Sequence, residues 1–179
     1  TARPPDRLTA VSWLLHVEPD DRPGAVNRAV DQALQDDTDQ CGTAALRLYR
    51  WDPPCLSFGR NEPAGRRYDR ATVTRLGLDV VRRPTGGRAV WHEHEVTYAV
   101  AAPVAAFGSL RAAYCAIHER LAEALRSLGA DVTLAPDRRV SRPPDHPAAC
   151  FASTVGGEVL AGDRKLVGSA QVRQGRAFL

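Results

Sequence analysis

The sequence predicts an α+β fold, with a mostly antiparallel or mixed central sheet flanked by helices. Short apolar segments bounded by Gly and Pro outnumber helical stretches, and they succeed one another as hairpins more often than as β-α-β units. The chain has 179 residues, which is enough for one domain over residues 1–179. Its composition, 44% apolar and 25% charged, is typical of globular proteins and excludes a disordered tail or a fibre.

The first half of the chain contains two expected helices. One runs over 25–36 after Pro23-Gly24, and the other runs from Tyr68 to Leu76 and is ended by Gly77. The longer helix has apolar residues at helical spacing, namely Val26, Ala29, Val30, Ala33 and Leu34. Strands are expected before and between the helices, at 11–15, 46–51 and 55–60.

The clearest element of the second half is a helix over 110–128, with Ser109 as its N-cap and Gly129 after its end. Its apolar stripe consists of Leu110, Ala113, Tyr114, Ile117, Leu121, Leu125 and Leu128. Strands are expected at 80–83, 89–91, 96–100, 131–134, 149–153, 157–160 and 165–172. The last two are predicted to form a hairpin across 161–164, and a loop rich in Pro and Arg is expected at 135–148.

Several classes of protein are not expected. The four cysteines, Cys41, Cys55, Cys115 and Cys150, form no Cys-x-x-Cys pair, so neither a disulfide framework nor a structural zinc site is predicted, and a cytoplasmic location is expected. No apolar run reaches the roughly 20 residues that span a bilayer, so no membrane partner is expected. The scattered arginines lack interleaved aromatic residues, and nucleic acid is not an expected partner.

Lys165 is the only lysine among 24 basic residues. Arginine cannot replace a compact ammonium whose protonation can be tuned, so a chain that otherwise uses arginine keeps lysine where that group is needed. The alternative is chance survival of one lysine on the surface. The small residues Gly168, Ser169 and Ala170 follow Lys165 and leave room for a ligand to lie against the strand, or else mark a tightly packed crossing of strands.

A glycine turn between two apolar segments is the second candidate site. It reads Arg82-Arg83-Pro84-Thr85-Gly86-Gly87-Arg88-Ala89-Val90. Two glycines let the backbone approach a ligand and present its amides to an anion or a carbonyl oxygen, and the flanking arginines suit a phosphate or carboxylate. The spacing is not that of a Walker loop, and an ordinary solvated turn is the alternative.

Two further residue types need an interpretation. Cys150 leaves the Pro- and Arg-rich loop fifteen residues before Lys165, and a nearby ammonium would favour its thiolate, although a buried structural cysteine is the alternative. His92 and His94 share one face of a strand, as two metal ligands do, but no third ligand is evident and no metal site is predicted.

Taken together, four segments resemble the lipoate–protein ligase and octanoyltransferase superfamily, which is related in fold to biotin–protein ligases. They are Asn27-Arg28-Ala29-Val30-Asp31-Gln32-Ala33, Leu56-Ser57-Phe58-Gly59-Arg60, the run from Arg82 to His92, and Lys165-Leu166-Val167-Gly168-Ser169-Ala170-Gln171. Gly-Gly-Arg-Ala at 86–89 and Ala-Cys-Phe at 149–151 are similar to the cysteine-dependent octanoyltransferases. ATP-dependent ligases usually carry a third glycine where Arg88 stands.

The resemblance implies an octanoyltransferase that moves the acyl group from acyl carrier protein to a lysine of a lipoyl domain, with Cys150 as the acyl acceptor and Lys165 as its partner. No cofactor is then expected. The implied substrate-binding residues are Arg82, Arg83, Thr85, Gly86, Gly87, Arg88, Ala89, His92, Gly168, Ser169 and Ala170. Apolar strand faces would enclose the eight-carbon chain. An arginine rim of Arg82, Arg83, Arg138 and Arg139 would steer the acidic carrier and lipoyl domains.

Two alternatives remain open at this point. One is a lipoate–protein ligase that uses ATP and lipoate to form an acyl-adenylate, and the other is a non-catalytic module that binds acyl groups or carriers. Members of the superfamily usually continue past the lysine strand into a further strand containing His-Gly. Here the sequence stops at Phe178-Leu179, and an exposed apolar edge is expected there, which favours a fragment over a split subunit or a loss of activity.

Overall fold

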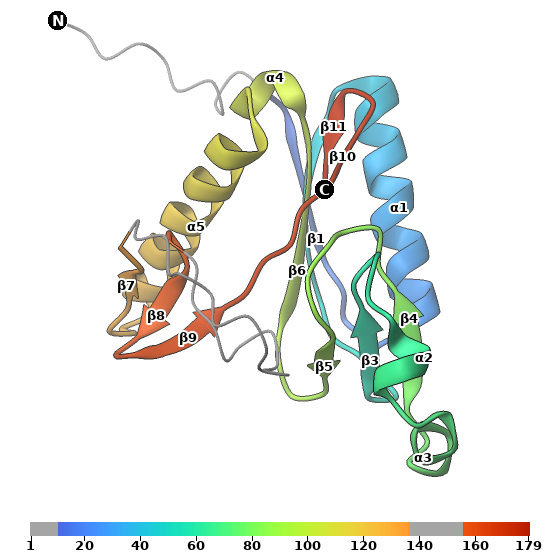
Figure 1. Cartoon of the computed structure of the whole chain (residues 1–179). Helices are drawn as coiled ribbons and strands as arrows, with labels where there is room; N and C mark the ends of the chain where they lie inside the picture. The colour runs from blue at the N-terminus through green and yellow to red at the C-terminus, as the bar shows by residue number, and fades with distance from the viewer. Residues whose placement is uncertain (1–10, 137–155) are drawn as a thin grey trace, which may run out of the picture. The chain divides into compact units, whose positions relative to one another are not determined.

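A computed structural model describes residues 11–136 and 156–179 of the chain. The chain divides into two compact units, one formed by Thr1–Gly108 with Gln171–Leu179 and the other by Ser109–Ala170. Each unit contains both helices and strands, as the predicted α+β class requires (Figure 1). In the described part of the chain, no helix is both long and apolar enough to cross a membrane.

The first unit is built on a five-stranded sheet in the order β1-β2-β6-β11-β10. Its strands are β1 (Trp13–Val17), β2 (Ala44–Tyr49), β6 (Thr97–Pro103), β10 (Arg173–Gln174) and β11 (Ala177–Phe178). Only the β1–β2 pair is parallel, because α1 (Gly24–Cys41) crosses over between these two strands. Figure 1 shows α1 along one side of this sheet, where it packs against β6, β11 and β2.

A second sheet of the same unit has the order β4-β3-β5. It consists of β3 (Cys55–Phe58), which is buried along its whole length, β4 (Asp79–Arg82) and β5 (Val90–His92). The short helices α2 (Ala64–Arg67) and α3 (Arg70–Arg75) connect β3 to β4. The glycine turn connects β4 to β5, so both of its ends are fixed by hydrogen bonding to β3.

The helix predicted over 25–36 forms as α1, but the residues that it buries are not the predicted apolar ones. Its buried face is a polar row at helical spacing, Asn27, Asp31, Gln35 and Thr38. Val26, which belongs to the predicted apolar face, is 41% exposed. The reason lies in β2, where Arg47 is fully buried and needs polar partners from the helix above it.

Arg47 donates to four oxygens on three residues, and one of these oxygens is the Asn27 backbone oxygen at 3.1 Å. Its Nη1 lies 2.9 Å from Asp31 Oδ1, its Nη2 lies 2.8 Å from Asn27 Oδ1, and its Nε lies 3.0 Å from Glu18 Oε1. Tyr49 Oη donates to Asp31 Oδ2 at 2.9 Å, and Arg28 bonds both Tyr49 and Asp31. Every carboxylate in this cluster has a cationic partner, so burying it is physically tolerable.

The second unit packs α5 (Leu110–Ser127) against an antiparallel sheet in the order β7-β8-β9 (Figure 1). The strands are β7 (Thr133–Leu134), β8 (Val159–Ala161) and β9 (Arg164–Val167). Ala122, Val132 and Val159 form the centre of its core. Ser109 caps α5 by accepting a hydrogen bond from the Ala112 amide, as predicted.

Two details of this unit differ from the sequence prediction. The hairpin between β8 and β9 is confirmed, but β9 ends at Val167 instead of extending to 172. The apolar stripe predicted on α5 is partly wrong, because the buried residues are Ala113, His118 and Ala122 while Leu128 is 84% exposed. The strand expected at 149–153 and most of the loop expected at 135–148 lie outside the described residues.

The exposed apolar edge expected at Phe178-Leu179 is not present. β11 pairs antiparallel with β6, where Phe178 lies opposite Ala102, and the Phe178 side chain is 4% exposed. β10, β11 and the one-turn helix α4 (Val104–Phe107) were not predicted. Strands of two residues are too short to show an alternating pattern. β11 forms by pairing with the distant β6, and β10 forms by pairing with β11.

Candidate functional site

The buried Arg83 side chain hydrogen-bonds the backbone of the glycine turn. The Arg83 guanidinium donates to the backbone oxygen of Ser57 at 2.7 Å, to that of Gly86 at 3.0 Å and to that of Arg88 at 2.6 Å. The side chain is only 7% exposed. Arg83 therefore does not belong to an exposed arginine rim. Its role in this structure is to fix the backbone of the turn on β3.

Arg82 fixes the neighbouring loop in the same way, although its side chain is exposed. Its Nη1 donates to three backbone oxygens after β3, those of Gly59 (2.6 Å), Arg60 (3.1 Å) and Glu62 (3.0 Å). The Arg60 amide in turn donates to the Thr85 carbonyl at 2.9 Å. The loop after β3 and the glycine turn after β4 are thus joined to each other by backbone hydrogen bonds and by the Arg82 side chain.

Of the remaining residues of the turn, some are buried in the core and others are exposed to solvent. Thr85 and Ala89 are buried, and Ala89 packs with Leu56 and Phe58. Gly86 is exposed, and Gly87 has φ +92°, a conformation that favours glycine. The backbone of Gly86 and Gly87 is therefore the part of the turn that a ligand can approach.

Gly59→Ala is expected to destabilise the first unit by about 1–3 kcal/mol. A Cβ at Gly59 would overlap the carbonyl group of Gly87, and backbone atoms cannot rotate away as a side chain can. Gly86→Ala is the matched control, because nothing lies within 4 Å of its Cβ position and its φ is not positive. Urea denaturation should show a loss for Gly59→Ala and a change within about 0.5 kcal/mol for Gly86→Ala. Equal stability of the two variants would contradict this account of the close approach.

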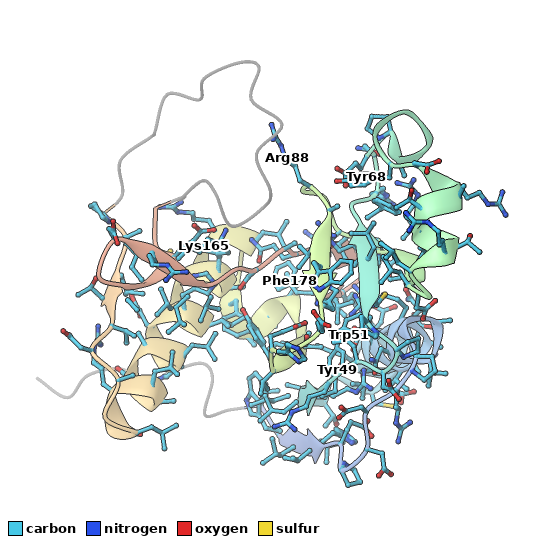
Figure 2. The ribbon with its side chains drawn as sticks, turned by 90° about the horizontal axis from the view of Figure 1, so that it is seen from below. Tyr49, Trp51, Tyr68, Arg88, Lys165 and Phe178 are labelled. Carbon is cyan, nitrogen blue, oxygen red and sulfur yellow. The ribbon has the colours of Figure 1, made fainter. Side chains whose placement is uncertain are left out.

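His92 interacts through a ring nitrogen with a carboxylate and through its ring face with an aromatic side chain. Its Nδ1 lies 2.6 Å from Glu95 Oε1, and the ring stacks on Trp51 at a centroid distance of 4.1 Å. Figure 2 shows Trp51 beside Tyr49, whose ring centroid is 5.6 Å away. His94 is 90% exposed in its side chain, and the described residues contain no group of three or more metal-ligating side chains. His92 is thus a packed residue that fixes the end of β5.

Lys165 is a buried side chain of β9 in the second unit, where Figure 2 labels it. Its Nζ lies 2.6 Å from Glu158 Oε1, and the two side chains are 4% and 3% exposed. The alternative of a lysine that survives by chance on the surface is therefore wrong. A buried ion pair carries a large desolvation cost, and it leaves the lysine ammonium fixed in orientation.

Ser169 lies on the extended segment after β9, with Gly168 and Ala170 on either side. Its Oγ is 2.6 Å from Nε2 of His118, which is fully buried on α5. His118 Nδ1 is 2.7 Å from the Gly157 backbone oxygen. Gly157 directly precedes Glu158, so His118, Glu158, Lys165 and Ser169 form one cluster, called here the Lys165 cluster.

Two members of the Lys165 cluster, His118 and Glu158, are not among the site residues predicted from the sequence. Both carry a signal that could have been used. His118 is a polar residue that interrupts the apolar face of a helix, and Glu158 is an acidic residue on an otherwise apolar segment. Such residues need a buried partner, and Lys165 and Ser169 are those partners.

The predicted site residues therefore fall into two groups, each ordered within its own unit. Arg82, Arg83, Thr85, Gly86, Gly87, Arg88, Ala89 and His92 belong to the first unit. Lys165, Gly168, Ser169 and Ala170 belong to the second unit. Cys150 lies outside the described residues. Among the described cysteines, burial, with Asp79 nearby, raises the pKa of the Cys55 thiol to about 12, which makes it a poor nucleophile.

Comparison with known proteins decides the family. The family model for the lipoyl protein ligase A/B catalytic domain matches residues 23–179. The chain belongs to this family. Octanoyltransferase LipM of Moorella thermoacetica is 41% identical over 158 residues, which cover 86% of this chain and 58% of that protein. Octanoyltransferase LipM of Kyrpidia tusciae is 43% identical over 159 residues, which cover 84% of this chain and 57% of that protein.

Solved structures support the fold of this lipoyl protein ligase A/B catalytic domain. A structure of lipoate-protein ligase A bound with ATP aligns with a TM-score of 0.72 at 23% identity, over 94% of this chain and 63% of that one. A bipartite lipoate protein ligase from Thermoplasma acidophilum aligns with a TM-score of 0.66 at 22% identity, over 94% of this chain and 58% of that one. The predicted superfamily and the α+β class are confirmed. The chain spans a little over half the length of its LipM relatives.

Proposed function

We propose that this chain transfers an octanoyl group from acyl carrier protein to a lysine of a lipoyl domain through a thioester on Cys150. Support comes first from relatives named octanoyltransferase LipM, at 41% and 43% identity. The observation that carries the proposal is the buried ion pair of Lys165 with Glu158. It supports a role for the single lysine of the chain as an oriented ammonium, because a buried ion pair is not a surface charge.

The proposed reaction has two steps. In the first, the Cys150 thiolate attacks the thioester carbonyl of the octanoyl donor. A new C–S bond forms, the C–S bond to the carrier breaks, and the carrier leaves as a thiolate that takes a proton from water. In the second, the amine of the target lysine attacks the Cys150 thioester. A C–N bond forms, the C–S bond breaks, and the electron pair of that bond returns to the Cys150 sulfur.

Lys165 would stabilise negative charge in both steps, first on the thiolate and then on the carbonyl oxygen as it becomes an oxyanion. Glu158 holds the ammonium at 2.6 Å and so limits its conformations before the substrate arrives. The exposed Gly86 and the neighbouring Gly87 would supply backbone donors to the substrate, on a turn that Arg83 already holds rigid. No step of this reaction calls for a cofactor.

The partners of the reaction follow from the same proposal. Acyl carrier protein would be the donor and lipoyl domains the acceptors. One structural neighbour is described as a lipoate protein ligase with its E2 lipoyl domain, which agrees with an acceptor of this kind. Exposed Arg82, together with Arg138 and Arg139, would attract acidic partners. A cytoplasmic location fits the free thiols of Cys41, Cys55 and Cys115.

Incubation with octanoyl carrier protein is expected to add one octanoyl group to the protein, and Cys150→Ser should abolish the addition. The reason is that a hydroxyl at this position is far less nucleophilic than a thiolate at neutral pH. Intact-mass spectrometry and peptide mapping measure both outcomes. Cys41→Ser is the matched control, because Cys41 is an exposed free cysteine at the end of α1, and acylation should persist in this variant.

Other results would contradict the proposal. Label on Cys41 or Cys115 in the wild-type protein would remove Cys150 from the mechanism. Exchange of pyrophosphate into ATP that requires lipoate and survives Cys150→Ala would establish the ligase reaction instead. Stable binding of octanoyl carrier protein without any acyl transfer would establish a binding module.

A further inference from the structure

One face of the β4-β3-β5 sheet leaves two large apolar side chains exposed. The residues opposite Leu56 are Val80 on β4 and Trp91 on β5, so the three form one row across this face. Residues of α2 and α3 pack on the cluster that contains Leu56, which is 8% exposed, whereas Val80 is 44% and Trp91 47% exposed. Tryptophan is enriched in protein interfaces, and neighbouring apolar side chains that remain exposed mark a contact surface.

Basic residues are concentrated in the segment that covers this face. Residues 60–88 contain eight arginines and three acidic residues, a net charge of +5, whereas the whole chain carries +3. Of the three acidic residues, Glu62 is buried, Asp79 is half-buried, and Asp69 caps α3 by accepting from two backbone amides. The exposed arginines of the segment include Arg60, Arg70, Arg75 and Arg82. These four arginines and the two exposed apolar side chains form a surface called here the basic face.

The basic face adjoins the glycine turn. Arg82 lies at the end of β4, shortly before the turn, and its guanidinium is 6.0 Å from the centre of the Phe58 ring on the same face of the sheet. The Arg60 amide donates to the Thr85 carbonyl at 2.9 Å, which joins the loop after β3 to the turn. Gly86 of the turn is exposed. A protein bound to the basic face would therefore lie beside the backbone that the proposed function assigns to the acyl substrate.

The charge of the basic face distinguishes between the two protein partners of the proposed reaction. A carrier protein holds its acyl group on an arm attached through a phosphodiester, so it presents an anion on the same arm as the acyl thioester. A lipoyl domain presents its target lysine, which is an ammonium before it reacts. Arginine binds phosphate and carboxylate oxygens and repels a cation. The basic face is therefore complementary to the donor of the acyl group.

We propose that the basic face is the docking surface for the acyl carrier protein that donates the octanoyl group. The inference rests on the proposed function and adds the place where its first substrate binds. The arginines contact acidic side chains and the phosphodiester of the carrier. Trp91 and Val80 supply the apolar part of the contact, which loses water when the carrier binds.

Arg70→Glu is expected to lower kcat/KM for acylation by octanoyl carrier protein about 10-fold, the lower end of the range that electrostatic steering contributes. Arg70 is exposed at the start of α3, where a carboxylate favours the helix, so the substitution should not unfold the segment. Acylation by octanoyl-pantetheine, a thioester without protein or phosphate, should be unchanged. Intact-mass spectrometry at a series of donor concentrations measures both reactions. At an ionic strength of about 1 M the loss should largely disappear, because charges are then screened beyond about 3 Å.

Arg173→Glu is the matched control for Arg70→Glu. Arg173 is also exposed, but it lies on β10, and Figure 1 shows β10 and α3 at opposite ends of the first unit. The same change of charge at this position should leave acylation by octanoyl carrier protein unchanged. An equal loss in both variants overturns the proposal, because the net charge of the protein would then explain the effect.

Trp91→Ala tests the apolar part of the basic face. It is expected to lower kcat/KM for octanoyl carrier protein about 10-fold, as the loss of an aromatic contact residue does, and added salt should not restore it. The Trp91 indole N–H donates to the exposed Glu93 at 3.0 Å, and the loss of this surface contact should cost little stability. Acylation by octanoyl-pantetheine should again be unchanged, whereas damage to the fold would slow both donors.

Each other outcome rejects a specific claim. Unchanged acylation by octanoyl carrier protein in both Arg70→Glu and Trp91→Ala overturns the docking surface and leaves the proposed function intact. Slower transfer from the acyl-enzyme to a lipoyl domain, without slower acylation, overturns it in favour of the acceptor. Absence of acylation of the wild-type protein by either donor overturns the proposed function itself.

A second copy of this chain is the competing occupant of the basic face, because residues 11–41 carry seven acidic residues and two arginines, a net charge of −5. Sedimentation velocity at several protein concentrations, without carrier protein, tests this alternative. A wild-type protein that associates and an Arg70→Glu variant that does not would overturn the assignment to the carrier. A monomer in both cases is the result expected.

Discussion

Lys165→Arg is expected to lower octanoyl transfer by about 100-fold, although the positive charge is kept. The Lys165 Nζ lies 2.6 Å from Glu158 Oε1 in an environment where the lysine side chain is only 4% exposed. A planar guanidinium is larger than an ammonium and places its charge differently, so it cannot occupy this site without displacing its neighbours. Loss of one oriented electrostatic contact to an oxyanion typically costs 10²–10³ in rate. The measurement is kcat/KM with octanoyl carrier protein.

The matched control for Lys165→Arg is Arg164→Lys. Arg164 is the neighbouring residue of β9, but it is exposed, so the opposite exchange of the two basic residues should leave transfer unchanged. A Lys165→Arg enzyme with near-normal turnover would mean that charge alone is sufficient. In that case the compact, oriented ammonium would lose its place in the mechanism.

The double variant Lys165→Met with Glu158→Leu separates the catalytic role of the pair from its structural role. Either single change leaves a buried charge without its partner, whereas the double change replaces the pair with apolar side chains. The double variant is therefore expected to be more stable than Glu158→Leu alone and still inactive. Recovery of activity together with stability would show that the pair is only a structural element.

The elements of this fold were more predictable than the faces they bury. Helix α1, the hairpin β8–β9 and the Ser109 cap of α5 follow from local signals, because capping and turn chemistry depend on a few adjacent residues. The buried face of α1 could not be predicted in this way. It is polar because Arg47 lies beneath it, and Arg47 is separated from Asp31 by 16 residues.

The candidate site shows the same division between local and distant information. Composition alone singles out Lys165 as the only lysine, and its burial shows that its side chain does not lie on the surface. The buried position of Arg83 was not predictable, because neighbouring arginines in a sequence look alike whether they face solvent or the carbonyls of a distant strand. His118 was hidden for a related reason. The apolar face that it interrupts indicates that it needs a buried partner, but no pattern within the helix identifies that partner as Ser169, 51 residues away.

Asp31→Ala is expected to destabilise the protein by about 3–5 kcal/mol, the cost of breaking a buried ion pair by removal of one partner. Asp31 is 2% exposed and accepts from Arg47 at 2.9 Å, from Tyr49 at 2.9 Å and from Arg28 at 2.7 Å. Its removal leaves the fully buried Arg47 with Glu18 as its remaining carboxylate. Urea denaturation followed by circular dichroism gives the free energy of unfolding.

Asp37→Ala is the control for Asp31→Ala, because it removes the same charge from an exposed position of the same helix and should change stability by less than about 0.5 kcal/mol. The double variant Asp31→Leu with Arg47→Met tests the origin of the loss. If an unpaired buried charge is the cause, the double variant should be more stable than Asp31→Ala, because it contains no charge to desolvate at these two positions. If the double variant is no more stable, the hydrogen bonds that Tyr49 donates to Asp31 and Arg47 donates to Asn27 hold α1 to the sheet, and the charge of Arg47 does not.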